Sequence, residues 1–217
     1  MTVRMGILVV VLVALVVSPA SAAIYTGTLS TTAGTLTGTS DWATLPVTFT
    51  YAVDNETRPG LWHYVYSISV PTEPRYPAIS EILIETDPVI TIGNLVNVTL
   101  SAGHINTVGL FQNSGDKALM PQSLYAADFS AGAGIRSLTI SFDTTYAPFW
   151  GNLFIVRTGQ ARAWNSGFTA TSVDPVDPPS VFHPDFILRP GIPEPSTLLI
   201  LLAGASVIRA RRRWRGA

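Results

Sequence analysis

Few residues of this sequence have both the type and the spacing that chemistry at a site requires. The histidines, His63, His104 and His183, lie far apart, and none has a metal-ligand spacing such as His-x-x-x-His. We therefore interpret each as a structural histidine. The sequence contains no cysteine, which excludes disulfides, thiolate metal ligands and cysteine nucleophiles. A Gly-x-Ser-x-Gly nucleophile segment is also missing, so we predict no catalytic residue and no enzyme.

Two other groups of residues have a chemistry to consider. Trp62, Tyr64 and Tyr66 alternate along one segment, so in a strand their rings lie on one face. They could stack on sugar rings as a carbohydrate platform, or they could fill the core, which is the interpretation we favour. Acidic and amide side chains at turns offer hard oxygen ligands for a structural Ca²⁺, although solvated turn acids are the commoner explanation. These are Asp54, Asn55, Glu56, Asp174 and Asp177. We predict no metal site and no other cofactor.

The elements that must position these residues read as β-strands throughout. Thr, Val, Ile, Tyr and Phe dominate, and no long window has helical periodicity. We expect strands at 24–30, 47–53, 61–70, 79–86, 89–92, 95–100, 107–111, 135–142 and 152–157. Residues 125–129 fit a strand or a helical turn equally well, and 181–188 would add an edge strand. Eight to ten strands with short polar turns predict an all-β fold, an antiparallel β-sandwich of jelly-roll or immunoglobulin-like type.

The first 22 residues have the pattern of a secretory signal peptide. Arg4 precedes an apolar run at 5–17, Pro19 follows, and Ala20 and Ala22 provide the small residues of a cleavage site. The apolar run is shorter than the roughly 20 residues of a membrane-spanning helix. A retained N-terminal anchor is the alternative. We expect cleavage and export.

The body of the chain is acidic although the whole sequence is almost neutral. Residues 23–192 contain seven Arg or Lys and thirteen Asp or Glu, a net charge of −6. Such a charge argues against nucleic acid as a partner, because nucleic acids select clustered Lys and Arg. We divide the body into a β-sandwich domain at 23–173 and a proline-rich extended spacer at 174–191.

The C-terminal segment has the pattern of a membrane stop signal. A short apolar run at 197–208 is followed by a basic tail at 209–217. As a helix, twelve residues span about 18 Å, well short of the roughly 30 Å hydrocarbon core. The arginines are expected on the cytoplasmic side and the body across the membrane. A run this short suits a signal that is processed better than a permanent anchor.

This segment resembles the PEP-CTERM sorting signal of Gram-negative bacteria. The resemblance covers residues 192–214: Pro193, Glu194 and Pro195 come first, then Ser196-Thr197, the apolar run, and Arg211, Arg212 and Arg213. Ile192 stands where many members have valine. The resemblance implies recognition of the tripeptide by exosortase, a membrane-embedded transpeptidase-like protease. It also implies an association with extracellular polysaccharide and biofilm. An ordinary tail anchor with an incidental Pro-Glu-Pro is the alternative.

Together these features predict an exported protein held transiently in the inner membrane by a short transmembrane helix, with its body in the periplasm. Processing would then leave it at the cell surface or outside the cell. Its predicted role is structural, as a component of an exopolysaccharide-associated matrix. The alternative is a carbohydrate-binding β-sandwich module with extracellular polysaccharide as partner, and a secreted hydrolase is a more distant one.

Overall fold

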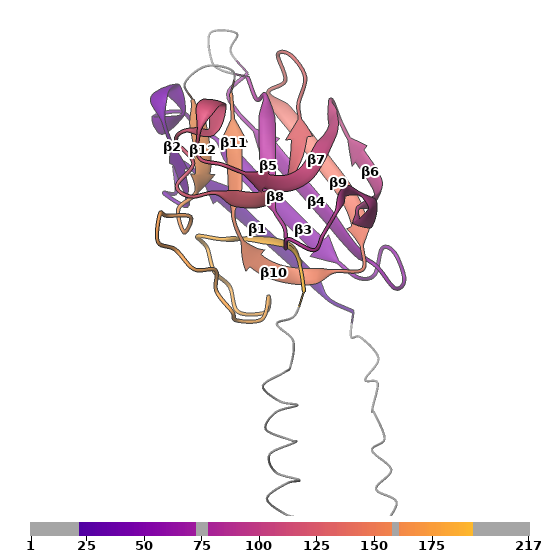
Figure 1. Ribbon diagram of the computed structural model, residues 1–217. Helices are drawn as coiled ribbons and strands as arrows, with labels where there is room; N and C mark the ends of the chain where they lie inside the picture. The colour runs from indigo at the N-terminus through magenta and orange to yellow at the C-terminus, as the bar shows by residue number, and fades with distance from the viewer. Residues whose placement is uncertain (1–21, 73–77, 158–160, 193–217) are drawn as a thin grey trace, which may run out of the picture.

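A computed structural model describes residues 22–72, 78–157 and 161–192 of the chain (Figure 1). Its strands are β1 (Ile24–Ser30), β2 (Leu36–Gly38), β3 (Thr48–Asp54), β4 (Trp62–Ser69), β5 (Glu81–Glu85), β6 (Val96–Leu100), β7 (His104–Phe111), β8 (Leu124–Ser130), β9 (Ser137–Thr144), β10 (Ala147–Gly151), β11 (Leu153–Val156), β12 (Arg162–Asn165) and β13 (Ile187–Gly191). Three single 3₁₀ turns, η1 (Ser40–Ala43), η2 (Ile92–Asn94) and η3 (Gly115–Lys117), lie between them. Within these ranges there is no helix with the length and apolarity to cross a membrane.

Two antiparallel sheets pack face to face, so the predicted antiparallel β-sandwich is confirmed. The five-stranded sheet has the order β1-β3-β4-β9-β6, and the six-stranded sheet has the order β2-β12-β11-β5-β8-β7. Aromatic rings from both sheets meet between them. Phe142 of β9 stacks on Tyr64 of β4 at 5.2 Å and on Phe129 of β8 at 6.3 Å. The first contact lies within the five-stranded sheet, and the second joins the two sheets across the core.

The sequence pattern of each sheet follows from what covers it. In β3 and β4, buried and exposed residues alternate, as expected for a sheet with one solvated face. In β5 and β11 the apolar residues are continuous, because the six-stranded sheet is covered on both faces. On its outer face Leu83 and Phe154 pack with Met120 and Phe168, which come from the connecting loops.

A two-stranded ribbon, β10 paired with β13, closes one end of the sandwich (Figure 1). All five residues of β13 are buried, so residues 187–191 belong to the domain and not to an extended spacer as the sequence suggested. Pro148 and Pro190 lie opposite each other in this ribbon. A two-stranded ribbon tolerates prolines because each strand has a free edge that needs no amide donor.

Two other expectations change, and one open alternative is decided. Residues 89–92 form a turn leading into η2 and not a strand, and residues 125–129, which fitted a strand or a helical turn, lie in a strand, β8. Strands β2, β10 and β12 were not expected, and the described residues contain thirteen strands in all.

Tyr64 and Tyr66 do not form a carbohydrate platform, because both side chains are fully buried. Burial raises the pKa of each hydroxyl well above its usual value, so both stay protonated. Each donates to a backbone carbonyl at the closed end: Tyr64 to Tyr146 at 3.0 Å and Tyr66 to Leu188 at 2.8 Å. The alternating aromatics therefore hold the closing ribbon onto the five-stranded sheet.

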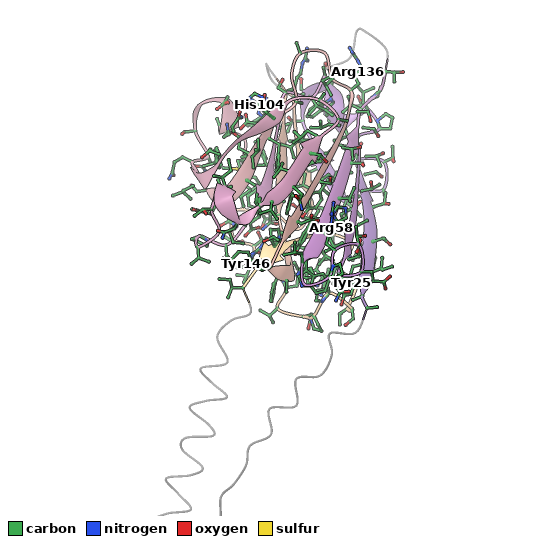
Figure 2. The ribbon with its side chains drawn as sticks, turned by 90° about the vertical axis from the view of Figure 1, so that its right-hand side faces the viewer. Tyr25, Arg58, His104, Arg136 and Tyr146 are labelled. Carbon is green, nitrogen blue, oxygen red and sulfur yellow. The ribbon has the colours of Figure 1, made fainter. Side chains whose placement is uncertain are left out.

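Both described ends of the chain lie at this same end of the sandwich, which we call the exit end. Ala23 exchanges hydrogen bonds with Asn55 beside the start of β1, and the amide of Ile192 donates to the Asp87 carboxylate just after β13. Figure 2 shows Tyr25, Arg58 and Tyr146 toward this end, with His104 and Arg136 toward the opposite one.

The Tyr66 hydroxyl provides a direct test of the ribbon's attachment. Tyr66→Phe leaves the buried Leu188 carbonyl without its donor, which is expected to lower the free energy of unfolding by about 1–2 kcal/mol. Tyr125→Phe is the matched control, because its partly buried hydroxyl lies 3.5 Å from the Ile90 carbonyl. Denaturant unfolding of the full chain in detergent measures both, and equal effects would show that Tyr66 does not secure the ribbon.

Candidate functional site

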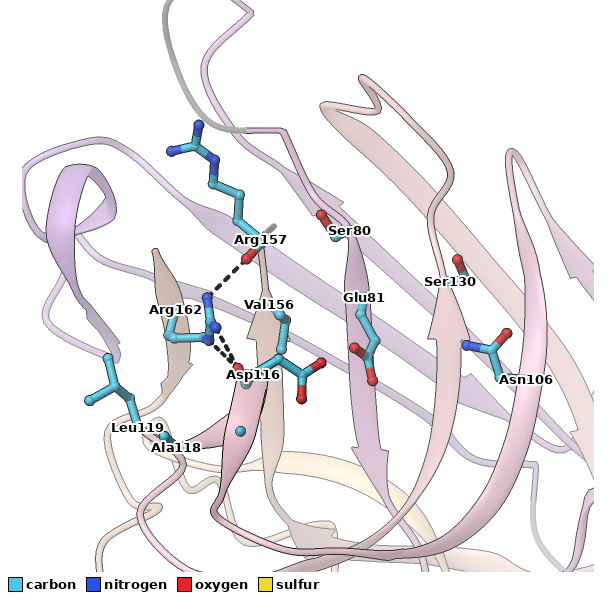
Figure 3. A pocket seen from close by; sticks show the side chains of 11 residues that line it. Ser80, Glu81, Asn106, Asp116, Ala118, Leu119, Ser130, Val156, Arg157 and Arg162 are labelled. Carbon is cyan, nitrogen blue, oxygen red and sulfur yellow. Dashed lines mark hydrogen bonds between the residues drawn. The ribbon is translucent and has the colours of Figure 1, made fainter. Parts of the chain in front are cut away.

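A polar pocket of about 520 Å³ opens on the outer face of the six-stranded sheet, toward the end opposite the exit end (Figure 3). We call it the carboxyl pocket. Its lining includes Ser80 and Glu81 at the start of β5, Ser130 at the end of β8, Asn106 of β7 and Arg162 of β12. The segment around η3 forms the remaining wall, with Asp116 and Leu119.

Glu81, which lines this pocket, has a second carboxyl group beside it. Glu81 and Asp128 lie on the neighbouring strands β5 and β8, two residue pairs apart in the antiparallel register. Burial raises the pKa of Glu81, the Lys117 ammonium 2.7 Å away opposes the shift, and the negative charge of Asp128 reinforces it. The two carboxyls are in hydrogen-bond contact, so protonated Glu81 can donate to Asp128.

Asp128 is buried beside the pocket and has two acceptor oxygens to satisfy. Its Oδ2 accepts a hydrogen bond from Asn106 Nδ2 at 3.0 Å, whereas its Oδ1 is buried. Leaving a buried carboxylate oxygen unpaired costs about 1–3 kcal/mol. The Glu81 carboxyl, which is in hydrogen-bond contact with Asp128, can supply a donor when it is protonated.

Arg162 builds the wall of the pocket and is held by backbone carbonyls. Its guanidinium donates to the carbonyls of Asp116, Arg157 and Ala161, at 2.8 Å for the Nε bond to Asp116 and 2.9 Å for the bond to Arg157. This ties η3, which carries Lys117, to the turn between β11 and β12. Figure 3 shows Arg162 bound to the Asp116 backbone, and the next residue, Lys117, carries the ammonium that faces Glu81.

The chemistry of this pocket suits binding of a polyhydroxylated ligand. Carboxylate, ammonium and amide groups lie beside apolar Ala118, Leu119 and Val156. Glycosidases that use two carboxyls keep them about 5 to 10 Å apart. The direct contact between Glu81 and Asp128 is closer than that, which does not fit such a catalytic pair.

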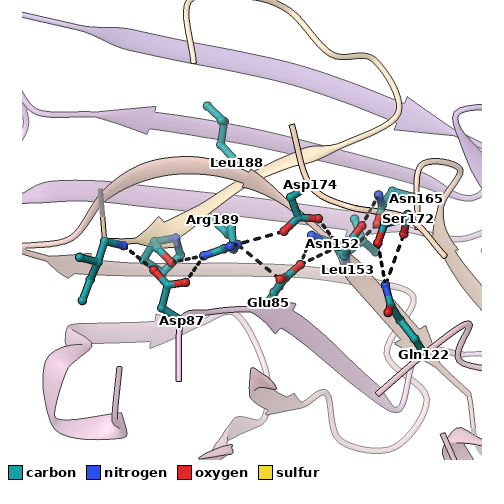
Figure 4. Close-up of polar contacts among 12 residues, drawn as sticks. Glu85, Asp87, Gln122, Asn152, Leu153, Asn165, Ser172, Asp174, Leu188 and Arg189 are labelled. Atoms are coloured by element: carbon teal, nitrogen blue, oxygen red, sulfur yellow. Dashed lines mark hydrogen bonds and ion pairs between the residues drawn. The ribbon is translucent and has the colours of Figure 1, made fainter. Parts of the chain in front are cut away.

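A second charged cluster lies at the exit end and is closed by its own partners (Figure 4). Arg189 of β13 pairs with Asp87 at 3.1 Å, Asp174 at 3.4 Å and Glu85 at 3.7 Å. Asn152 joins the acids by donating from its side chain to Glu85 and to Asp174, at 2.7 Å each. This cluster links β13, the end of β5 and the loop before β13, so its role is to hold the ribbon in place.

The buried position of this cluster changes the protonation of Glu85. Burial raises the pKa of Glu85 from its usual 4.5 to about 8; Arg189 opposes the rise and the Asp174 carboxylate adds to it. The Arg189 side chain lies flat across Gly151, where a Cβ atom would come within 2.4 Å of its Nε. Only glycine at position 151 lets the guanidinium reach all three acids.

The histidines occupy structural positions. His63 Nδ1 lies 2.6 Å from the buried Asp143 carboxylate, which also accepts from Asn97 at 2.6 Å and pairs with Arg58 at 3.4 Å. His183 lies 3.0 Å from Asp177 and packs edge-on against Trp150. His104 lies on β7 with an exposed side chain.

Other predicted site residues are placed apart from one another. Trp62 is half-buried at the exit end, where its ring stacks on Tyr25 at 6.2 Å and not on Tyr64 or Tyr66. The acids considered for Ca²⁺ do not converge: Asp54 caps its own turn by accepting from the amides of Glu56 and Thr57, while Asp174 pairs with Arg189. Among the described residues, no group of three or more His, Asp or Glu could hold a metal ion.

Sequence reasoning missed Asp128, Lys117 and Arg189 as site residues. Each of these residues takes part in a site only because it contacts a residue from a distant segment. The spacing of residues in one sequence does not predict such contacts. The alternation of Glu81, Leu83 and Glu85 on one strand was the available signal, because it places two acids on a face that also carries an apolar residue. The predicted sorting residues Pro193, Glu194, Pro195, Arg211, Arg212 and Arg213 lie outside the described residues, as does Ala20.

No family model and no curated protein matches this sequence. Among solved structures, the chain is similar to the KRT10-binding region domain of the pneumococcal serine rich repeat protein PsrP. The match has a TM-score of 0.28 and 10% identity, and it covers 67% of this chain and 98% of that chain. A similarity at this level does not establish a shared function.

Protonated Glu85 makes stability depend on pH. Its pKa of about 8 in the folded state exceeds the 4.5 of the unfolded chain, so between these values the folded state retains a proton that the unfolded state has lost. Stability therefore falls as pH rises from about 5 to 8, by roughly 1.4 kcal/mol for each pKa unit of difference. Glu85→Gln mimics the protonated acid and is expected to flatten much of this decline.

The measurement is denaturant unfolding of the full chain at pH 5 and pH 8. Glu56→Gln, at an exposed turn position, serves as the control and should keep the wild-type slope. An unchanged slope in Glu85→Gln would mean that Glu85 is ionised in the fold.

Proposed function

We propose that this protein is an exported, non-enzymatic surface or matrix protein whose β-sandwich is delivered by a cleaved signal peptide and a PEP-CTERM sorting signal. In this proposal residues 197–208 hold the chain transiently in the inner membrane, with the body in the periplasm. An exosortase-like enzyme then acts near Pro193-Glu194-Pro195. The sandwich is left at the cell surface or in the extracellular polysaccharide matrix as a structural or adhesive component.

The observation that carries this proposal is the position of the last described strand. Strand β13 is buried through Gly191, and the amide of Ile192 is bound by Asp87. The next residue is Pro193, the first of the tripeptide. Cleavage beyond Ile192 would therefore remove no part of the fold that the structure describes. This is the arrangement that a processing tag requires.

A second candidate function is carbohydrate binding through the carboxyl pocket. Ser80, Glu81 and Asn106 line this pocket with Lys117 next to them, and this polar set favours a ligand rich in hydroxyl groups. Extracellular polysaccharide is the ligand class that fits both this pocket and the proposed location. Binding here would be a different mode of carbohydrate recognition from the aromatic platform that the sequence offered as an alternative to core packing.

Sorting is tested with Glu194→Ala in a host that expresses an exosortase. The wild-type protein is expected to lose its C-terminal segment and leave the membrane, whereas the variant should keep its full mass and stay in the membrane fraction. Glu56→Ala is the control, because it removes an exposed acid far from the signal in sequence. If Glu194→Ala is processed and released like the wild type, the sorting proposal is wrong.

Carbohydrate binding is tested with Glu81→Gln, which keeps the size of this pocket-lining side chain and removes its ability to ionise. Retention on the host exopolysaccharide is expected to fall about tenfold or more, since a hydrogen bond to a charged group contributes about 1.5–3 kcal/mol. Near-UV circular dichroism confirms the fold, and Asp177→Asn, at an exposed loop position, should bind normally. Retention that does not change in Glu81→Gln excludes the pocket as the binding site.

A further inference from the structure

The exit end carries the most exposed apolar side chains of the described chain. Val173 and Val176 are 84% and 82% exposed, and Ile24, at the start of β1, is 62% exposed. Two grooves, of about 440 Å³ and 310 Å³, share Phe149 and Val176 as lining residues. The grooves form one continuous surface beside Ile192, which lines the larger one.

Aromatic residues suited to an interface border this surface. Tyr25 and Trp62 stack on each other at 6.2 Å, and both line the smaller groove together with Pro148 and Phe149. Tyrosine and tryptophan are enriched where water meets lipid, because each ring combines an apolar body with a polar atom.

The charged side chains nearest these grooves are partly paired within the fold. Arg189 pairs with Asp87 and Asp174, and Asp177 lies against His183. The acids outnumber the single arginine, so this end favours a zwitterionic over an anionic lipid surface. Large exposed apolar areas of this kind generally mark a contact surface.

The short segment between Ile192 and the C-terminal apolar run indicates that the partner of this surface is the membrane. Only residues 193–196 separate Ile192 from the apolar run at 197–208. The five residue steps from Ile192 to Thr197 reach at most about 18 Å even when fully extended. The headgroup layer occupies roughly 6 Å of that distance. While the tail is in the membrane, the exit end must therefore lie within about 12 Å of the lipid surface.

We propose that the exit end is a lipid-contacting surface, on which Ile24, Val173 and Val176 enter the headgroup region while the C-terminal run is inserted. This inference rests on the proposed sorting function and goes beyond it, because it assigns the membrane a contact with the folded body. The body then stands on the bilayer with its carboxyl pocket directed away from it. Removal of the tail releases a weakly bound surface.

The absence of cysteine allows single-site labelling of the full chain. Val176→Cys carries an environment-sensitive fluorophore at the exit end, and Leu119→Cys is the matched control, because Leu119 is apolar and 49% exposed but lines the carboxyl pocket. Both proteins are reconstituted into phosphatidylcholine vesicles that contain nitroxide-labelled lipids. The label at position 176 is expected to be quenched several-fold more strongly than the label at position 119. Adding Val173→Asp should reduce this difference.

The outcomes separate the two proposals. If the protein floats with the vesicles but both labels are quenched equally, the lipid-contacting surface is refuted and the anchoring proposal stands. If the label at position 176 shifts to shorter wavelength without quenching, a protein surface covers the exit end, which also refutes lipid contact. If the full chain does not float with the vesicles, anchoring fails and the lipid contact fails with it.

Discussion

The buried guanidinium of Arg189 is the interaction on which the closed end of the sandwich depends. A cation in this position requires anionic partners, and the chain supplies them from the end of β5 and from the loop before β13. The same contacts fix β13, whose apolar residues Ile187 and Leu188 complete the core. Replacing Arg189 with a neutral residue would leave the three acids without a counter-charge. The contacts that attach β13 to the core would be lost at the same time. Packing and electrostatics are therefore inseparable at this end.

The two ends of the sandwich differ in their charged groups and in the surface that lies over them. At the exit end every acid around Arg189 has a partner, and the surface above it is apolar. At the other end, Glu81 and Asp128 lie together beside a polar pocket that Glu81 lines. An open polar pocket suits recognition of a ligand, whereas an exposed apolar surface suits attachment. This difference is why we propose recognition at the carboxyl pocket and attachment at the exit end.

The sequence predicted the parts of the fold that local pattern encodes. The alternation in β3 and β4 gave the hairpin, and the first strand was placed at its observed bounds. Strands β10 and β13 were hidden by their prolines, because the tolerance for proline comes from a ribbon edge that only tertiary structure reveals. The aromatic face of β4 was rightly favoured as core. Its hydroxyl partners, and the pairing of Glu81 with Asp128, depend on contacts between segments that no local pattern records.

The place of β13 in the chain has a consequence for the timing of folding. If the protein crosses the membrane from its N-terminal side, strands β1 to β12 arrive before the strand that supplies Ile187, Leu188 and Arg189. Until then the sandwich is open at one end and its acids repel one another. The fold can close only when residue 191 has crossed, two residues before the Pro-Glu-Pro segment. In that case the domain finishes folding at nearly the same time as the Pro-Glu-Pro segment emerges from the membrane. A chain that stops before β13 would have neither a complete sandwich nor the tripeptide.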